Sequence, residues 1–191
     1  MKRKINVSII ASFFVFLIMT GCKKELGDNL PPLTFEGKNT FGCRVNDNCW
    51  LPQGHSDFAT GIYTPPTRGG YFQWSKYSGT HILIRADKGF ESIELFIRDY
   101  SGQGFIMPGK YFFNKKTRSI NYSNYWEETH SYGAYGIGIL STDSLHTGWI
   151  EILKSDTINK IISGRFEFEV YNSYNNKIYK ITDGRFDYKS N

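Results

Sequence analysis

Apolar and polar side chains alternate along residues 165–170, in the order Arg, Phe, Glu, Phe, Glu, Val. A period of two places all the apolar side chains on one face of an extended strand, whereas a helix would scatter them around its axis. Aromatic residues make up 17% of the chain, and large flat side chains favour strands. This pattern, which recurs elsewhere in the sequence, predicts an all-β domain.

Segments with strand patterns are separated by short connections. We expect strands at residues 41–45, 49–51, 81–87, 91–99, 109–114, 135–140, 148–154, 158–171 and 177–188. With about nine or ten strands and no helix longer than a turn or two, the sequence favours an antiparallel meander. The meander either closes into a barrel, which would be calycin-like, or folds into a sandwich.

The most specific pairing joins the third and fourth of these strands. A two-residue turn at positions 88 and 89 sets Ile82 opposite Leu95 and Ile84 opposite Ile93. This register places the apolar residues of both strands on one face.

Two later turns also have clear signals. The hairpin between 148–154 and 158–171 is expected to turn at Asp156 and Thr157. In the last strand the apolar residues change parity across Asp183 and Gly184, and an extra residue in a β-bulge produces such a change.

The N-terminal residues differ in composition from the rest of the chain. Basic residues at positions 2–4 precede an apolar run that ends at Met19, and this run is shorter than the roughly 20 apolar residues of a transmembrane helix. The run ends in the sequence Met-Thr-Gly-Cys at positions 19–22, which resembles a lipobox, so Cys22 is expected to be lipidated. The expected organisation is a signal peptide at 1–21, a lipidated tether at 22–38 and a single β-rich domain at 39–191.

Removal of the signal peptide changes the net charge. Residues 1–21 hold three of the 23 basic residues and none of the 18 acidic ones, so 20 basic and 18 acidic residues remain, with a net charge of +2. A nearly neutral chain gives no reason to expect nucleic acid as a partner.

Two cysteines remain in the domain, where an oxidising compartment would favour a disulfide. A three-residue loop centred on Asn46 would place Cys43 opposite Cys49. A two-residue loop at Asn46 and Asp47 would set Cys43 opposite Trp50 and strain the bridge. Both alternatives stay open at this point.

Sequence segments near both ends of the domain are distinctive. They read LPPLTFEGKNTFGCRVN at 30–46, ISGRFEF at 162–168 and ITDGRFD at 181–187. These segments resemble an uncharacterised family of Gram-negative outer-membrane lipoproteins, classed as a domain of unknown function. Asp47 and Cys49 depart from the family pattern, so any disulfide would be a local feature. The resemblance implies a β-rich fold and a lipid anchor in the outer membrane, and it leaves open which face of the membrane carries the protein. It implies no activity.

The segment 121–138 places aromatic rings among polar residues, where they can stack on sugar rings or grip a partner. The candidates for ligand binding are Tyr122, Tyr125, Trp126, Tyr132 and Tyr135. The competing interpretation is that these rings fill the core at one end of the β-structure.

Other chemical groups give weaker signals. The four histidines are scattered, so the sequence indicates neither a metal site nor a cofactor, and no catalytic residue stands out. Glu167 and Glu169 fit the solvated face of a strand. Asp-Ser-Leu at 143–145 and Asp-Thr-Ile at 156–158 resemble an O-glycosylation sequon of some Gram-negative bacteria, with Ser144 and Thr157 as acceptors.

Three functions are compatible with these patterns. The leading hypothesis is a non-enzymatic, membrane-tethered module that binds a glycan or an envelope protein. The second is a barrel that carries a small hydrophobic ligand, which requires a cavity in its interior. The third is a glycan-directed hydrolase that uses Glu127 or Glu128 and needs two carboxylates in one cleft.

Overall fold

The computed structural model describes residues 29–56, 60–73, 79–89, 91–99, 104–113, 122–126, 139–173 and 175–190. The expected all-β fold class is confirmed, because every regular element in these ranges is a strand and every pairing is antiparallel. No helix in the described part is long and apolar enough to cross a membrane.

The larger sheet has six strands and contains both ends of the domain. Its order is β2 (Asn48–Trp50), β1 (Thr40–Val45), β13 (Lys177–Lys189), β12 (Ile161–Asn172), β11 (Gly148–Asp156) and β8 (Gly109–Phe113). Because β1 pairs with β13, the first and last strands lie side by side, and β11, β12 and β13 form a meander.

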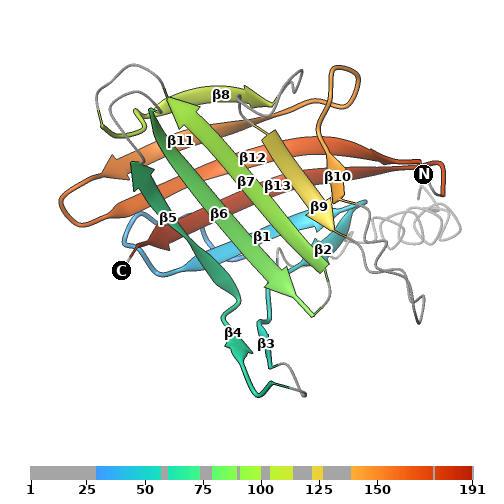
Figure 1. The fold of residues 1–191 in the computed structure, drawn as a ribbon, viewed down its shortest axis with the longest axis horizontal. Helices are drawn as coiled ribbons and strands as arrows, with labels where there is room; N and C mark the ends of the chain where they lie inside the picture. The colour runs from blue at the N-terminus through green and yellow to red at the C-terminus, as the bar shows by residue number, and fades with distance from the viewer. Residues whose placement is uncertain are drawn as a thin grey trace, which may run out of the picture.

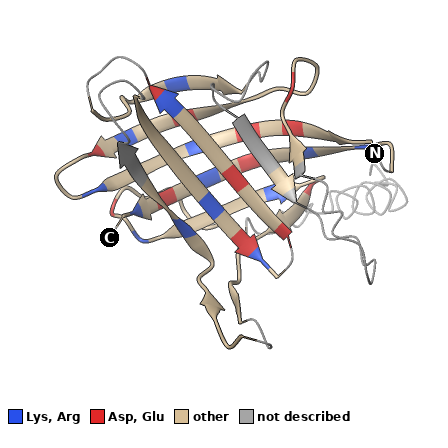
Figure 2. Cartoon of the chain, in the orientation of Figure 1, with Lys and Arg blue, Asp and Glu red and all other residues tan. Residues whose placement is uncertain are grey.

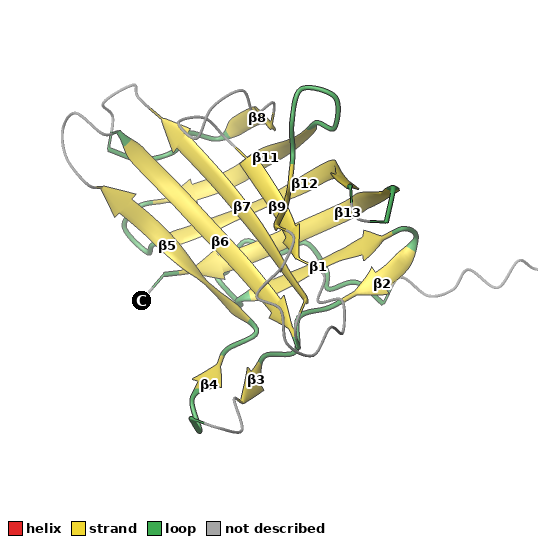
Figure 3. Ribbon diagram, turned by 45° about the vertical axis from the view of Figure 1, so that its right-hand side comes forward, coloured by secondary structure: helices red, strands yellow, loops and turns green. Residues whose placement is uncertain are grey.

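The smaller sheet has five strands and crosses the larger one. Its order is β10 (Ile139–Ser141), β9 (Tyr122–Trp126), β7 (Glu91–Asp99), β6 (Thr80–Lys88) and β5 (Thr67–Gln73). In Figure 1 its strands run diagonally in front of β11, β12 and β13, and the turned view in Figure 3 shows the two layers. A short pair, β3 (His55–Ser56) and β4 (Tyr63–Thr64), projects from the body. The molecule is therefore a sandwich and not a closed barrel.

Large apolar side chains fill the space between the sheets. Phe113, Phe166 and Phe186 come from the larger sheet and are at most 1% exposed, and the rings of Phe41 and Phe166 lie 5.1 Å apart between centroids. The facing sheet contributes a set of fully buried aliphatic residues: Ile82, Ile84, Ile93, Leu95 and Ile97. Burial of each such side chain stabilises the fold by about 1.5–3 kcal/mol.

The register of β6 and β7 differs from the prediction. Ile82 pairs with Ile97 and Ile84 pairs with Leu95, so the predicted register was wrong by two residues. The predicted faces were right, because a shift of two residues keeps every side chain on its face. The turn follows Lys88 and begins at Gly89, whose φ of 59° suits the first position of a two-residue turn, whereas Lys88 would be strained there.

The predicted long hairpin and the predicted bulge are both present. The hairpin joins β11 to β12, but Asp156 pairs with Ile161, so the turn extends over the four residues 157–160. The register shifts between Phe166 and Phe168, which leaves an extra residue in β13 at Asp183, where φ is 53°. Gly184 is required beside the bulge, because a Cβ atom there would lie 2.5 Å from the carbonyl oxygen of Phe166.

The hairpin β1–β2 decides the question of the disulfide. Its turn has two residues, Asn46 and Asp47, both with positive φ, and Cys43 lies opposite Trp50. Cys49 lies opposite Arg44, so consecutive positions place the two thiols on opposite faces of the sheet. Both cysteines are free, and the disulfide considered from the sequence is not formed. Burial raises the pKa of Cys43 far above its usual value.

Residues 29–38, which the sequence assigns to the tether, lie against the domain. Leu30 is 5% exposed, and the carboxylate of the fully buried Asp187 in β13 holds the segment. Asp187 accepts hydrogen bonds from the Thr34 hydroxyl at 2.6 Å, from the amides of residues 36–38 at 2.9–3.1 Å, and from the Ser163 hydroxyl at 2.6 Å. Burial raises the pKa of Asp187, but these hydrogen bonds outweigh it and lower the pKa to about 2. We call this arrangement the Asp187 clasp.

Candidate functional site

The aromatic segment predicted as a ligand site lies mostly outside the described residues. Tyr132 and Tyr135 fall there, as do Glu127 and Glu128 of the hydrolase hypothesis, and so does the part of the expected strand 135–140 that precedes β10. Tyr122 and Trp126 belong to β9, opposite Phe96 and Ser92 of β7, and the structure describes only their backbone.

Tyr125 is the one member of this set whose side chain is described, and it belongs to the core. It is 3% exposed, and its ring centroid lies 5.2 Å from that of Tyr179 in β13. Its assignment to a surface ligand site is therefore corrected, since a ring between two sheets cannot reach a ligand outside. Its neighbour in register, Ile93, is also fully buried, which shows that this position faces the interior.

A different aromatic residue, Trp149, stands on the outer face of the six-stranded sheet, the face turned away from the five-stranded sheet. Its neighbours in β11, Ile150 and Ile152, point into the core, so the alternation of the strand turns Trp149 outward. In register, Phe112 of β8 lies opposite Trp149 on one side and Glu167 of β12 lies opposite on the other. Phe112 is 60% exposed.

Two adjacent hollows meet at Trp149 and Glu167. One has a volume of about 310 Å³ and is lined by Leu33, Trp149, Arg165, Glu167, Asp183 and Arg185. The other has a volume of about 270 Å³ and is lined by Thr147, Trp149, Glu167, Glu169, Lys180 and Thr182. The residues around the first hollow include Phe166 and Gly184, which lie opposite each other in β12 and β13 beside the bulge. We call these two hollows the Trp149 surface.

Ion pairs and a cation–π contact fix the side chains of this surface. The Arg165 guanidinium donates to Glu151 at 2.7 Å, and Arg44 donates to Asp183 at 3.1 Å. The Lys110 ammonium lies 4.0 Å from the centre of the Trp149 ring, a distance at which the cation is attracted to the ring face. Lys110 comes from β8 and is not among the residues that line either hollow, so it contacts the indole without filling them.

The charges of the outer face are mixed. Figure 2 shows basic and acidic residues interspersed along the strands of both sheets, without a large patch of one sign in the described part. Such a surface offers both donors and acceptors to a neutral polar ligand, and it does not create a strong long-range field. The carboxylates Glu167 and Glu169, expected on a solvated strand face, are on this face and line the hollows.

Other candidate chemistry is sparse in the described part of the chain. No group of three or more potential metal-ligating side chains occurs there. His146 contacts the Asp143 carboxylate at 3.2 Å and stacks on Tyr171, at 5.4 Å between ring centroids. Ser144 and Thr157, the predicted modification sites, both lie in exposed turns.

The sequence did not direct attention to Trp149, although a signal was present. In the segment Gly-Trp-Ile-Glu-Ile at 148–152, Trp149 shares its parity with Glu151 and not with the two isoleucines. A tryptophan on the polar parity of an amphipathic strand is unusual enough to mark a surface. The segment 121–138 was more conspicuous only because its aromatic residues are more numerous.

Comparison with known proteins identifies a family but not an activity. The searches of curated proteins and of solved structures each gave no match. A family model described as a domain of unknown function, DUF6252, matches residues 68–188. This range includes both of the C-terminal segments noted in the sequence, whereas the N-terminal segment at 30–46 precedes it. Because the match covers more than half of the chain, the protein belongs to this family of domains of unknown function.

Proposed function

We propose that this protein is a lipid-anchored module of the outer membrane that binds a glycan on the Trp149 surface. The observation that carries the proposal is an outward-facing tryptophan, held in place by Lys110, between two hollows lined by carboxylates and cations. The module binds its ligand and performs no chemistry on it, and Cys22 holds it to the membrane.

The chemistry of the surface suits a sugar better than an apolar molecule. An indole ring gives flat apolar contact for the C–H face of a sugar ring, and it does so at low cost in side-chain entropy. Glu167 and Glu169 accept hydrogen bonds from hydroxyl groups, while Arg185 and Lys180 donate them. The combined hollows, about 310 and 270 Å³, have the size of a site for a small oligosaccharide.

The alternatives from the sequence have less support. A carrier of a hydrophobic ligand needs space inside the sandwich, but the described core is filled by aromatic and aliphatic side chains, and both hollows open on the outer face. The hydrolase hypothesis rests on Glu127 and Glu128, which lie outside the described residues. An envelope protein remains the second kind of partner, because the Trp149 surface is open enough for a protruding side chain.

The lipid anchor has its own test. Cells that express the full chain are labelled with a palmitate analogue, and the protein is extracted by detergent phase separation. We expect label and partition into the detergent phase for the natural chain, and loss of both in a Cys22→Ser variant. An unlabelled natural chain in the aqueous phase would refute the anchor and leave the glycan site untouched.

The glycan site is tested by binding of residues 23–191 to a broad glycan array, followed by calorimetry on the best oligosaccharide. Trp149→Ala should weaken binding by about tenfold or more, which corresponds to about 1.4 kcal/mol. Tyr63→Ala is the matched control, because Tyr63 is an aromatic residue, 61% exposed, on the remote β3–β4 pair.

Three other outcomes of the glycan-binding experiment would contradict the proposal or move the site. If no glycan binds, the proposal is wrong. If a glycan binds but only Trp126→Ala removes the binding, the site lies at the aromatic segment and not at the Trp149 surface. If Trp149→Ala and Tyr63→Ala weaken binding equally, the contacts are nonspecific and the proposal also fails.

A further inference from the structure

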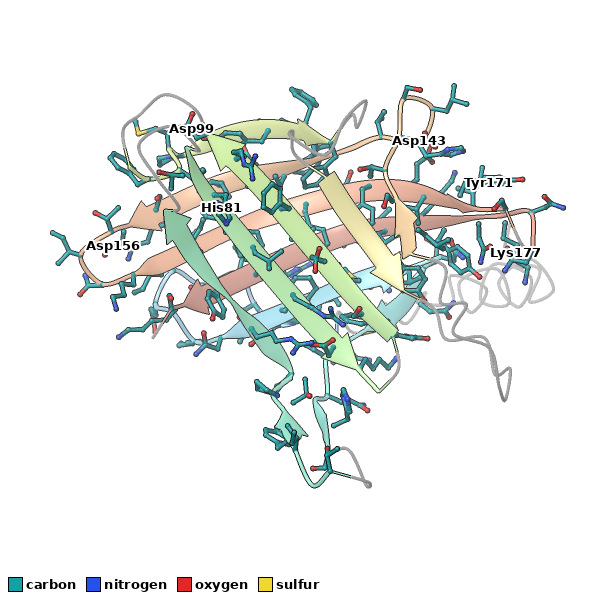
Figure 4. All side chains as sticks on the ribbon, in the orientation of Figure 1. His81, Asp99, Asp143, Asp156, Tyr171 and Lys177 are labelled. Atoms are coloured by element: carbon teal, nitrogen blue, oxygen red, sulfur yellow. The ribbon has the colours of Figure 1, made fainter. Side chains whose placement is uncertain are left out.

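Two turns at opposite ends of β11 are built in the same way. In the first, Oδ1 of Asp143 accepts hydrogen bonds from the amides of Leu145 at 2.8 Å and His146 at 2.7 Å. In the second, Oδ1 of Asp156 accepts from the amides two and three residues later, at 3.1 and 2.9 Å. Figure 4 labels both aspartates, which lie at opposite ends of the molecule.

The match extends to the fourth residue of each turn. The second oxygen of the Asp143 carboxylate lies 3.2 Å from the His146 ring nitrogen Nδ1. The corresponding oxygen of Asp156 accepts from the Asn159 side-chain amide at 2.8 Å. Each carboxylate is thus held by two backbone amides and one side chain. Because a single acidic residue organises the whole turn, the residue after it has a defined position.

The residues between the aspartate and the fourth position are displayed to solvent. Ser144 and Thr157 are exposed, and the next residues, Leu145 and Ile158, are 81% and 90% exposed. These are the two highest values among the large apolar side chains whose burial is described. Full exposure of a large aliphatic side chain forgoes about 1.5–3 kcal/mol of burial energy. Both turns therefore display a large aliphatic side chain beside a hydroxyl, where a partner protein can contact both groups at once.

The aspartates of both turns are ionised at neutral pH. Burial raises the pKa of Asp143, but hydrogen bonds from His146 and Leu145 lower it below the usual value overall. The pKa of Asp156 is lowered chiefly by the Asn159 side chain and amide. Both turns therefore present an anionic carboxylate next to the hydroxyl throughout the neutral pH range.

We propose that Ser144 and Thr157 are equivalent acceptors for one O-glycosyltransferase, which recognises the ordered aspartate, the hydroxyl and the exposed aliphatic side chain as a unit. This inference is independent of the Trp149 surface, since it makes the protein a substrate for glycan attachment and not a receptor.

The transfer needs an activated sugar, a nucleotide-linked or lipid-linked sugar phosphate, as the second substrate. The bond between the anomeric carbon and the phosphate oxygen breaks, and a bond from that carbon to Oγ of Ser144 or Oγ1 of Thr157 forms. The hydroxyl proton passes to a base on the transferase, and the phosphate leaves with its carrier. No electrons are transferred, so neither oxidant nor reductant is required.

The test is mass spectrometry of the full-length protein, purified from the cells that naturally produce it. We expect a saccharide mass on the peptides that contain Ser144 and Thr157, with fragment ions that assign it to these residues. Ser144→Ala and Thr157→Ala should each remove one saccharide. Ser173→Ala is the matched control, because Ser173 is exposed in a turn but follows an asparagine and not an aspartate, and it should leave both saccharides in place.

Substitutions of the neighbours test the recognition unit. Asp156→Asn keeps an oxygen acceptor for the turn but removes the charge, and Asp156→Ala removes both. Occupancy at Thr157 should fall in both variants and also in Ile158→Ala, and all of these positions are near the surface, so the fold is retained. Natural protein that is unmodified at both sites, or modified at only one, would overturn the inference. Equal modification of Ser173 would overturn it as well.

Discussion

The Asp187 clasp and the Asp156 turn use the same chemistry in opposite surroundings. Both carboxylates accept hydrogen bonds from successive backbone amides and from a side chain. Asp187 is fully buried and joins segments about 150 residues apart in sequence, whereas the partners of Asp156 all lie within three residues of it. From this comparison we expect the contribution of such a carboxylate to stability to depend on burial and on the length of chain it closes, and not only on the number of its hydrogen bonds.

The largest effect is expected from removal of the buried carboxylate. Asp187→Ala leaves the Ser163 hydroxyl and the amides of 36–38 without their acceptor, so the free energy of unfolding should fall by about 3–4 kcal/mol. The measurement is urea denaturation of residues 23–191. Asp156→Ala in the same assay should leave the midpoint nearly unchanged, because water replaces the lost partner. Equal losses of stability in the two variants would show that burial does not make the Asp187 clasp more stabilising than the Asp156 turn.

A smaller effect should appear in the pH dependence of stability. The pKa of Asp187 is lowered to about 2 in the folded protein and is near 3.8 when the chain is unfolded. The unfolded chain therefore binds more protons between these values, so the contribution is complete above pH 4 and is lost as the pH falls towards 2. After allowance for solvent screening, we expect about 1–2 kcal/mol. Melting temperatures from pH 5 to pH 2 should fall more steeply for the natural protein than for Asp187→Asn, and parallel curves would contradict this assignment.

The smallest effect on stability is expected when one side-chain hydrogen-bond donor is removed from each of the two carboxylates, Asp187 and Asp156. Thr34→Val keeps the shape of the side chain but removes its hydrogen bond to Asp187, while the backbone amides still satisfy the carboxylate. We expect a loss of about 1 kcal/mol by chemical denaturation. Asn159→Ala removes the equivalent donor to Asp156, and it should have no measurable effect on stability. A larger loss of stability for Asn159→Ala than for Thr34→Val would contradict the expectation that the buried carboxylate contributes more to stability than the exposed one.

The candidate site was less predictable than the fold. Alternation identified the strands, but it could not tell whether an aromatic residue on a given parity meets another sheet or solvent. Tyr125 stands between an asparagine and a tryptophan in a largely polar segment and is buried against Tyr179. Trp149, by contrast, lies between a glycine and an isoleucine and faces outward. Their roles depend on which sheet covers which face, and strands distant in sequence decide that.

The sequence by itself determined the all-β class, the main hairpins, the faces of β6 and β7 and the bulge near Gly184. Each of these follows from side-chain periodicity or from the φ angles that a turn demands, and such preferences act over a few residues. Only the tertiary structure decided the register of β6 with β7, the separation of Cys43 from Cys49, and the Asp187 clasp. The Asp187 clasp joins segments about 150 residues apart, which no local pattern reveals. The other two features depend on where a short hairpin turns, and turns displaced by one residue fit nearly the same side-chain pattern, so the pattern left these alternatives open.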